Sequence, residues 1–196
     1  MAAKKGKKGF STYILPILFC GLLIVLALVK GRQMEQPVKA ILQEGEPLTL
    51  TEQAMENYLF SAGFILNGEA ILNSDGQQVG ALTVSRNEDG AIESMALTFP
   101  LTTFIPTESD EGLGPLKAAH DDDAQRGQDL FLALFDAVSA TDKRVANRRD
   151  SAAEKLQTAM DTGKAAVQNA NSWRFDFSLE PGLFEGTVTV SFTLVK

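Results

Sequence analysis

The sequence predicts an α+β fold, in which a transmembrane helix at residues 9–29 precedes one domain with an antiparallel sheet of four or five strands. Three observations predict it. Residues 9–29 carry no charge, residues 64–101 and 173–195 alternate apolar and polar side chains, and helical hydrophobic patterns lie between them. A period of two is typical of half-buried strands, and a period of 3.6 is typical of amphipathic helices. We expect about three helices to cover one face of a sheet made of a meander and a C-terminal hairpin.

The apolar run at residues 9–29 is long enough to cross a bilayer. At 1.5 Å of rise per residue, such a helix is about 30 Å long, which is the thickness of the hydrocarbon core. Residues 1–8 contain four lysines, and two more basic residues follow the run directly. Because Lys and Arg are retained on the cytoplasmic side, we expect a cytoplasmic tail at 1–8 and an extracytoplasmic domain at 48–196. The polar segment 30–47, which contains two prolines, is expected to be a tether.

A cleaved signal peptide is the alternative for this segment. The apolar run exceeds the usual h-region of about 7 to 15 residues, and its end lacks a small-residue cleavage pattern. We therefore expect the segment to be retained as an anchor. The only cysteine, Cys20, lies inside the run, so the domain can form no internal disulfide.

A short pattern stands directly before the apolar helix. Lys7, Lys8, Gly9 and Phe10 resemble the leader of type IV pilins and pseudopilins, in which a peptidase cuts between the Gly and the Phe. The resemblance implies processing after Gly9 and a role as a minor pilin or pseudopilin-like component of a secretion or pilus assembly. The family has an acidic residue five positions into the mature chain, where this sequence has Ile14. This function is the first alternative.

Charge is divided unevenly along the chain. Residues 1–32 contain six of the 18 Lys and Arg and none of the 25 Asp and Glu, so the remaining residues carry a formal charge of −13. A domain this acidic repels phosphate backbones and anionic headgroups. We therefore expect no nucleic-acid partner, and a soluble body held near a membrane.

The first part of the domain predicts one helix and a meander. Thr49 and Glu52 fit a capping box, and Gly63 follows an apolar pattern of helical spacing as a helix end. Turn signals at Asn73–Gly76 and Asn87–Gly90 then separate three apolar stretches. The three strands of the meander are expected at residues 65–72, 79–85 and 92–99.

Residues 104–120 are predicted to be a long irregular loop, because they hold two prolines, two glycines and three acids. The only histidine, His120, then precedes Asp121, Asp122 and Asp123. These side chains could ligate a divalent cation, or the acids could begin a helix whose dipole they stabilise. Three consecutive acids do not converge easily on one ion. We therefore expect a helix start here and assign no metal ligand.

Two helical stretches follow. The first has Phe131, Leu134, Phe135 and Val138 on one face and is expected to pack on the sheet. The second is predicted at residues 143–170, with an apolar side made mostly of alanine and with Gly163 as the point where it bends or divides.

One basic cluster, made of Lys143, Arg144, Arg148 and Arg149, stands out in the acidic domain. It could bind an anionic partner such as a wall polymer, a lipid headgroup or an acidic protein surface. It could also be a solvated helix start that is offset by nearby acids. We expect the second, because no aromatic residues are interleaved with the charges and exposed ion pairs contribute little. The offsetting acids are Asp142, Asp150 and Glu154.

The C-terminal residues predict a hairpin. Trp173–Glu180 has a large apolar residue at every odd position, and Thr187–Val195 alternates in the same way after a turn at Pro181 and Gly182. Trp173 and its alternate aromatic neighbours could form a binding platform, but their strict alternation favours the core. The opposite face of the sheet is rich in Thr and Ser, and we expect it to be exposed and to be the natural place for a partner if there is one.

No motif carries identifiable chemistry, so we assign no catalytic, cofactor-binding or metal-binding residue and no cofactor. We expect a single-pass, membrane-anchored extracytoplasmic interaction or ligand-binding module of a bacterial cell envelope. It contacts the bilayer through residues 9–29, and its expected partner is an envelope protein or a wall polymer. The second alternative is a carboxylate-dependent envelope enzyme such as a hydrolase, since acid and base need not be close in sequence. Two carboxylates converging in a pocket would favour the enzyme, whereas a polar sheet face or an apolar groove would favour binding.

Overall fold

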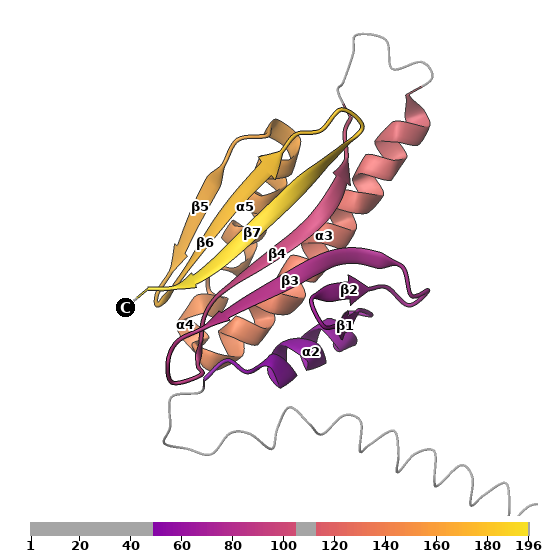
Figure 1. Ribbon diagram of the computed structural model, residues 1–196. Coiled ribbons are helices and arrows are strands. Elements are labelled where there is room, and N and C mark those ends of the chain that lie inside the picture. The colour runs from indigo at the N-terminus through magenta and orange to yellow at the C-terminus, as the bar shows by residue number, and fades with distance from the viewer. Residues whose placement is uncertain (1–48, 105–112, 196) are drawn as a thin grey trace, which may run out of the picture. The chain divides into compact units, whose positions relative to one another are not determined.

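A seven-stranded antiparallel sheet forms the centre of the domain. The computed structural model describes residues 49–104 and 113–195, and Figure 1 shows their arrangement. The strand order is β1-β2-β3-β4-β7-β6-β5. The strands are β1 (Ile65–Asn67), β2 (Ala70–Leu72), β3 (Gln78–Arg86), β4 (Ile92–Thr102), β5 (Ala166–Ala170), β6 (Trp173–Glu180) and β7 (Glu185–Leu194). The predicted α+β class is confirmed, and the predicted number of four or five strands is wrong.

Helices form a layer on one face of the sheet (Figure 1). They are α2 (Glu52–Ser61), α3 (Gly114–Thr141), α4 (Lys143–Ala146) and α5 (Arg149–Thr162). Helix α3 packs on β4, α2 and α5 each pack on α3, and α5 also contacts β5 and β6. Because α4 is a single turn, three longer helices make up the layer.

The predicted tail at 1–8, transmembrane helix at 9–29 and tether at 30–47 lie outside the described residues. Within residues 49–104 and 113–195, no helix is both long enough and apolar enough to cross a membrane.

A turn at Gly68, which was not predicted, and a break in the helix at Gly163, which was, account for the extra strands. Residues 65–72 form a hairpin instead of one strand, because Gly68 adopts a φ of +61° and reverses the chain between β1 and β2. Residues 166–170 form the edge strand β5 instead of a helix. Gly163, with a φ of +66°, ends α5, and the following residues pair with β6. The Ala- and Gln-containing sequence of β5 has no strong strand propensity, so pairing with β6 decides its conformation.

Helix α3 begins earlier than the sequence predicted. It starts at Gly114 with Pro115 in its first turn, a position where the missing N–H of proline costs nothing. Residues 114–120 are therefore helical, and the predicted loop is wrong for them, while 105–112 lie outside the described residues. Asp121, Asp122 and Asp123 stand inside the helix, so their predicted place at its start is also wrong.

The first helix is capped by Thr51 and not by Thr49. The Thr51 hydroxyl oxygen accepts a hydrogen bond from Ala54 N at 3.2 Å, and Glu52 forms an ion pair with Arg86 of β3. Gly63 follows this helix with a φ of +90°, as the sequence predicted. The second and third strands of the predicted meander and the C-terminal hairpin are confirmed, with strand ends that differ by a few residues.

A cluster of aromatic rings lies in the core between α3 and the sheet. The ring of Phe131 lies 5.6 Å from that of Phe135, 5.5 Å from that of Phe177 and 5.8 Å from that of Phe192, measured between centroids. Phe175 joins the same cluster, and Trp173 is also buried. The aromatic residues of β6 therefore belong to the core, as their alternation predicted, and do not form a surface platform.

Candidate functional site

His120 and the neighbouring acids tie α3 to the end of β4. The Nδ1 of His120 lies 2.7 Å from the carbonyl oxygen of Thr102, to which it donates. The carboxylate of Asp123 accepts from Thr102 N at 2.9 Å and from the Thr102 hydroxyl at 2.6 Å, and pairs with Arg126 at 3.0 Å. Asp121 pairs instead with Lys117. His120, Asp121 and Asp123 thus bind different partners. No group of three metal-ligating side chains occurs in the described part of the chain.

The basic cluster is divided between two environments. Arg149 forms two hydrogen bonds with the carboxylate of Asp136, at 2.8 and 3.1 Å, and these bonds raise the pKa of Arg149. Arg144 lies 3.7 Å from Asp142, while Lys143 and Arg148 are exposed. Asp142 is one of the acids expected to offset the cluster. Asp136 was missed, because it lies on the preceding helix at a distance that spacing does not reveal.

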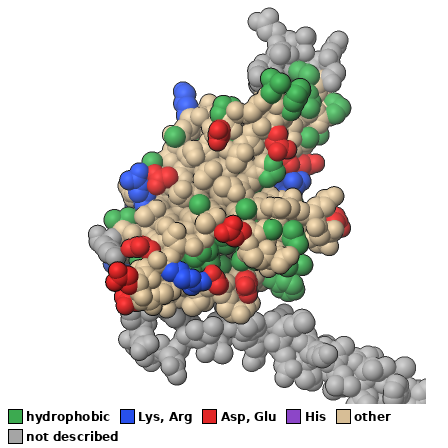
Figure 2. Space-filling view, in the orientation of Figure 1, with side chains coloured by type: hydrophobic (Ala, Val, Ile, Leu, Met, Phe, Trp, Pro, Cys, Tyr) green, Lys and Arg blue, Asp and Glu red, His purple; other side chains and the backbone are tan. Residues whose placement is uncertain are grey.

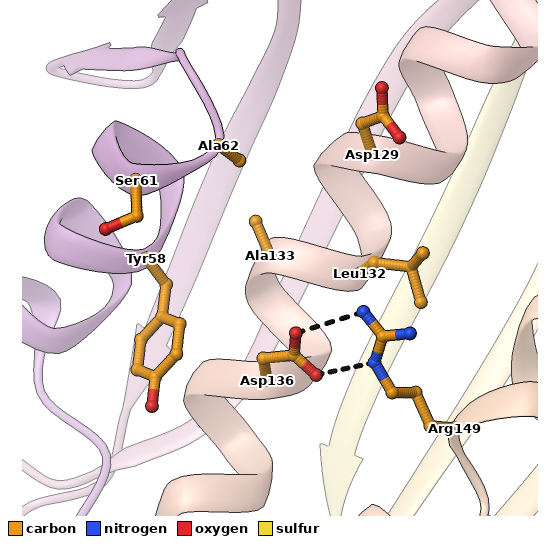
Figure 3. Close-up of a pocket in the computed structure, with 8 residues that line it drawn as sticks. All are labelled: Tyr58, Ser61, Ala62, Asp129, Leu132, Ala133, Asp136 and Arg149. Atoms are coloured by element: carbon orange, nitrogen blue, oxygen red, sulfur yellow. Dashed lines mark hydrogen bonds and ion pairs between the residues drawn. The ribbon is translucent and has the colours of Figure 1, made fainter.

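A shallow groove of about 420 Å³ lies between α2 and α3 (Figure 3). Asp129, Leu132, Ala133 and Asp136 share the face of α3 that lines it, at helical spacing. Helix α2 contributes Tyr58 and Ser61, the residue after it is Ala62, and Arg149 comes from α5.

The two carboxylates of this groove do not converge. Asp129 and Asp136 are seven residues apart on one helix, which separates them by roughly 10 Å along its axis. Paired carboxylates in hydrolases of sugars are separated by about 5 to 9.5 Å. In addition, Asp136 is held by Arg149 (Figure 3). Asp129 accepts a hydrogen bond from Gln125 Nε2 at 2.9 Å. The groove therefore offers a partly apolar surface with a polar margin and not an acid and base aimed at one point.

The uncovered face of the sheet carries small hydroxyl side chains. Ser94 of β4 lies opposite Thr193 of β7, and Thr98 lies opposite Thr189. Figure 2 shows this side of the molecule, where most side chains over β4 and β7 are neither charged nor apolar. Antiparallel sheets commonly leave one face in water. This face could contact a partner, but its exposure alone does not indicate one.

The loop between β6 and β7 holds two large apolar side chains in solvent. Leu183 is 84% exposed and Phe184 is 80% exposed, the highest values among the large hydrophobic residues that the structure describes. We call this pair the apolar tip. Phe60, the next most exposed, reaches 69%. Elsewhere in the described chain, residues of this size are mostly buried in the core.

Hydrogen bonds from Thr103, which follows β4, hold the backbone of this loop. Thr103 N donates to the carbonyl of Phe184 at 2.9 Å, and the Thr103 hydroxyl donates to the carbonyl of Gly182 at 3.0 Å. A Cβ at Gly182 would lie only 1.8 Å from the carbonyl oxygen of Glu185, so the turn requires glycine. The apolar tip is therefore presented by an ordered turn.

Sequence reasoning missed the apolar tip. The turn at Pro181 and Gly182 was predicted, but the next two residues were not considered. The apolar alternation of β6 ends at Leu179, and the predicted return strand begins at Thr187. Leu183 and Phe184 belong to neither the alternation of β6 nor that of β7. Two large apolar residues in such a connection are the sequence signal that could have revealed the apolar tip.

The opposite end of the domain is held together by Asp142. Its carboxylate caps α4 through Arg144 N at 3.0 Å and accepts from Ser172 Oγ at 2.7 Å and from the Asn171 amide. A groove of about 430 Å³ at this end is lined by Thr49 and Asp142, among others. Thr49 is the first described residue, so the described part of the chain begins at this end. The apolar tip lies at the far end of β6 from this groove (Figure 1).

The hydrogen bonds from Asn171 and Ser172 lower the pKa of Asp142. A carboxyl group whose pKa is lower in the folded state stabilises the fold above its unfolded pKa of about 3.9 and loses that contribution as the pH falls. We expect Asp142→Ala to lower the free energy of unfolding by about 1 to 2 kcal/mol at pH 7. Urea unfolding at several pH values should show this deficit shrinking below about pH 4. The exposed Asp122→Ala is the control; an Asp142 deficit independent of pH would contradict the role of the charge.

Comparison of the sequence with family models and curated proteins, and of the fold with solved structures, found no match. The function is therefore argued from the residues of the domain itself.

Proposed function

We propose that this chain is a single-pass, membrane-anchored extracytoplasmic module of a bacterial cell envelope that acts by binding a partner protein. The observation that carries the proposal is the apolar tip. Full burial of a Leu or Phe side chain contributes about 1.5 to 3 kcal/mol, and Leu183 and Phe184 forgo most of this in the isolated domain. Exposed apolar groups of this kind mark interaction sites.

The turn itself does not require these two side chains. Its geometry depends on Gly182 and on hydrogen bonds from Thr103 to carbonyl groups, which any residue supplies. Polar residues at positions 183 and 184 would serve the hairpin and favour solubility. The apolar character of Leu183 and Phe184 is therefore best explained by a contact outside the domain.

The anchor part of the proposal is supported by the uncharged run at residues 9–29 and by the lysines before it. The tether would join the domain at the end that contains Thr49. The apolar tip lies at the opposite end of the domain from Thr49, the first described residue.

Photo-crosslinking in intact bacterial cells tests this function. A benzophenone amino acid at position 184 is expected to give a covalent adduct with another protein, whereas the same group at Thr158, exposed on α5, gives none. External protease should release the domain and leave the lysine-rich tail protected. Absence of any adduct at position 184 would refute binding through the tip, and protection of the domain until lysis would refute the extracytoplasmic placement.

A further inference from the structure

We infer that the partner of the apolar tip is a protein with an apolar pocket whose margin carries Lys or Arg; this inference rests on the proposed function. Leu183 and Phe184 project from a tight hairpin loop, so the tip is convex. A convex pair of side chains is removed from water only by a concave surface. The convex shape of the tip therefore requires a pocket on the partner.

The charge of the margin follows from two carboxylates beside the tip. Glu180 ends β6 and Glu185 begins β7, and both lie at positions that alternate with core residues and therefore face the uncovered side of the sheet. Both are exposed, and neither has a cationic partner within residues 49–104 and 113–195. A partner that covers the tip brings its own surface against these carboxylates. Lys or Arg at that place forms favourable pairs, whereas an acidic margin is repelled.

The net charge of the rest of the domain also favours a basic partner. The described residues include 19 Asp and Glu but only 10 Lys and Arg. The resulting negative potential attracts a basic surface over several ångströms and raises the rate of encounter. The dominant short-range contact is apolar, and the electrostatic field selects the partner.

The same carboxylates disfavour two other occupants. Insertion into a bilayer would place Glu180 and Glu185 among headgroups, whereas segments that insert at interfaces are typically flanked by Lys and Arg. Contact between the tips of two copies of this chain would bring four carboxylates together. A basic pocket on a different protein satisfies both the apolar and the charged residues of the tip.

Charge reversal combined with photo-crosslinking tests the inference on the full-length chain in cell membranes. The probe is a benzophenone amino acid at position 184, and adducts are mapped by mass spectrometry. In the variant Glu180→Lys/Glu185→Lys we expect the yield of protein adduct to fall about tenfold, as for like charges brought together at an interface. The matched control Glu56→Lys/Glu69→Lys makes the same charge change at exposed positions elsewhere and should leave the yield unchanged. The mapped site should be apolar, with Lys or Arg beside it.

Several outcomes separate this inference from the proposed function. Protein adducts whose yield is unaffected by the reversal, or whose mapped site lacks basic neighbours, would overturn the basic margin and leave binding through the tip intact. Adducts only with lipid, or only with position 183 or 184 of a second copy, would overturn the inference in favour of those occupants. No adduct at position 184 would overturn both proposals. Trp173 fluorescence shows that each variant is folded, since this residue is the only tryptophan and is buried.

Discussion

Phe131→Ala is expected to lower the free energy of unfolding by about 3 to 5 kcal/mol, the range for loss of a fully buried aromatic side chain. Phe131 has no exposed surface, and its ring contacts the rings of four other phenylalanines, one on α3 and three on the sheet. Truncation would leave a cavity between the two layers, and the ordered elements around it can collapse only partly into the space.

Urea unfolding of the full-length chain in detergent micelles, followed by Trp173 fluorescence, measures this effect. Phe60→Ala is the control, because it removes the same side chain at a position that is 69% exposed and should change stability by less than about 0.5 kcal/mol. Similar losses for the two variants would show that the aromatic cluster does not hold α3 on the sheet.

Gly127→Ala is expected to be the second most damaging change, by about 1 to 3 kcal/mol. A Cβ at this position would lie 2.1 Å from the Phe99 ring, so α3 approaches β4 at a distance that only glycine permits. Phe99 is only 3% exposed and has little room to move. The clash outweighs the gain in helix propensity that alanine brings over glycine, which is about 1 kcal/mol.

The same helix offers a matched control for this variant. Gly114→Ala adds the same methyl group where nothing lies within 4 Å, and it should be neutral or slightly stabilising. Thermal unfolding of both variants gives the difference. The double variant Gly127→Ala/Phe99→Leu should recover part of the loss, because the smaller side chain makes room; no recovery would mean that the ring is not the obstacle.

Periodicity predicted the parts of this fold in which one face of each element is buried. Strands β6 and β7 and the stripe around Phe131 on α3 were found because burial imposes a strict pattern on their sequences. Strand β5 was missed because it is a short edge strand whose sequence, AVQNA, has only two core-facing residues, Gln168 and Ala170, well buried. The start of α3 was missed because glycine and proline next to acidic residues are typical of loops.

The candidate site was less predictable than the fold. The pairing of Arg149 with Asp136, and of Asp123 with Thr102, depends on how elements pack and not on any local spacing. The apolar tip has a signal in the sequence, but that signal becomes meaningful only when exposure is known. An apolar residue in a turn is buried in many proteins, and here the turn lies at the outer end of the hairpin.

The order of strands also determines when the domain can fold during its synthesis. Strands β4 and β7 are neighbours in the middle of the sheet, although Thr102 ends one and Glu185 begins the other. The first four strands therefore have an unpaired edge at β4 until residues 185–194 have been synthesised. Pairings between such distant segments form slowly. The seven-stranded sheet is therefore completed only after β7 has been synthesised, however early α2 and the first four strands form.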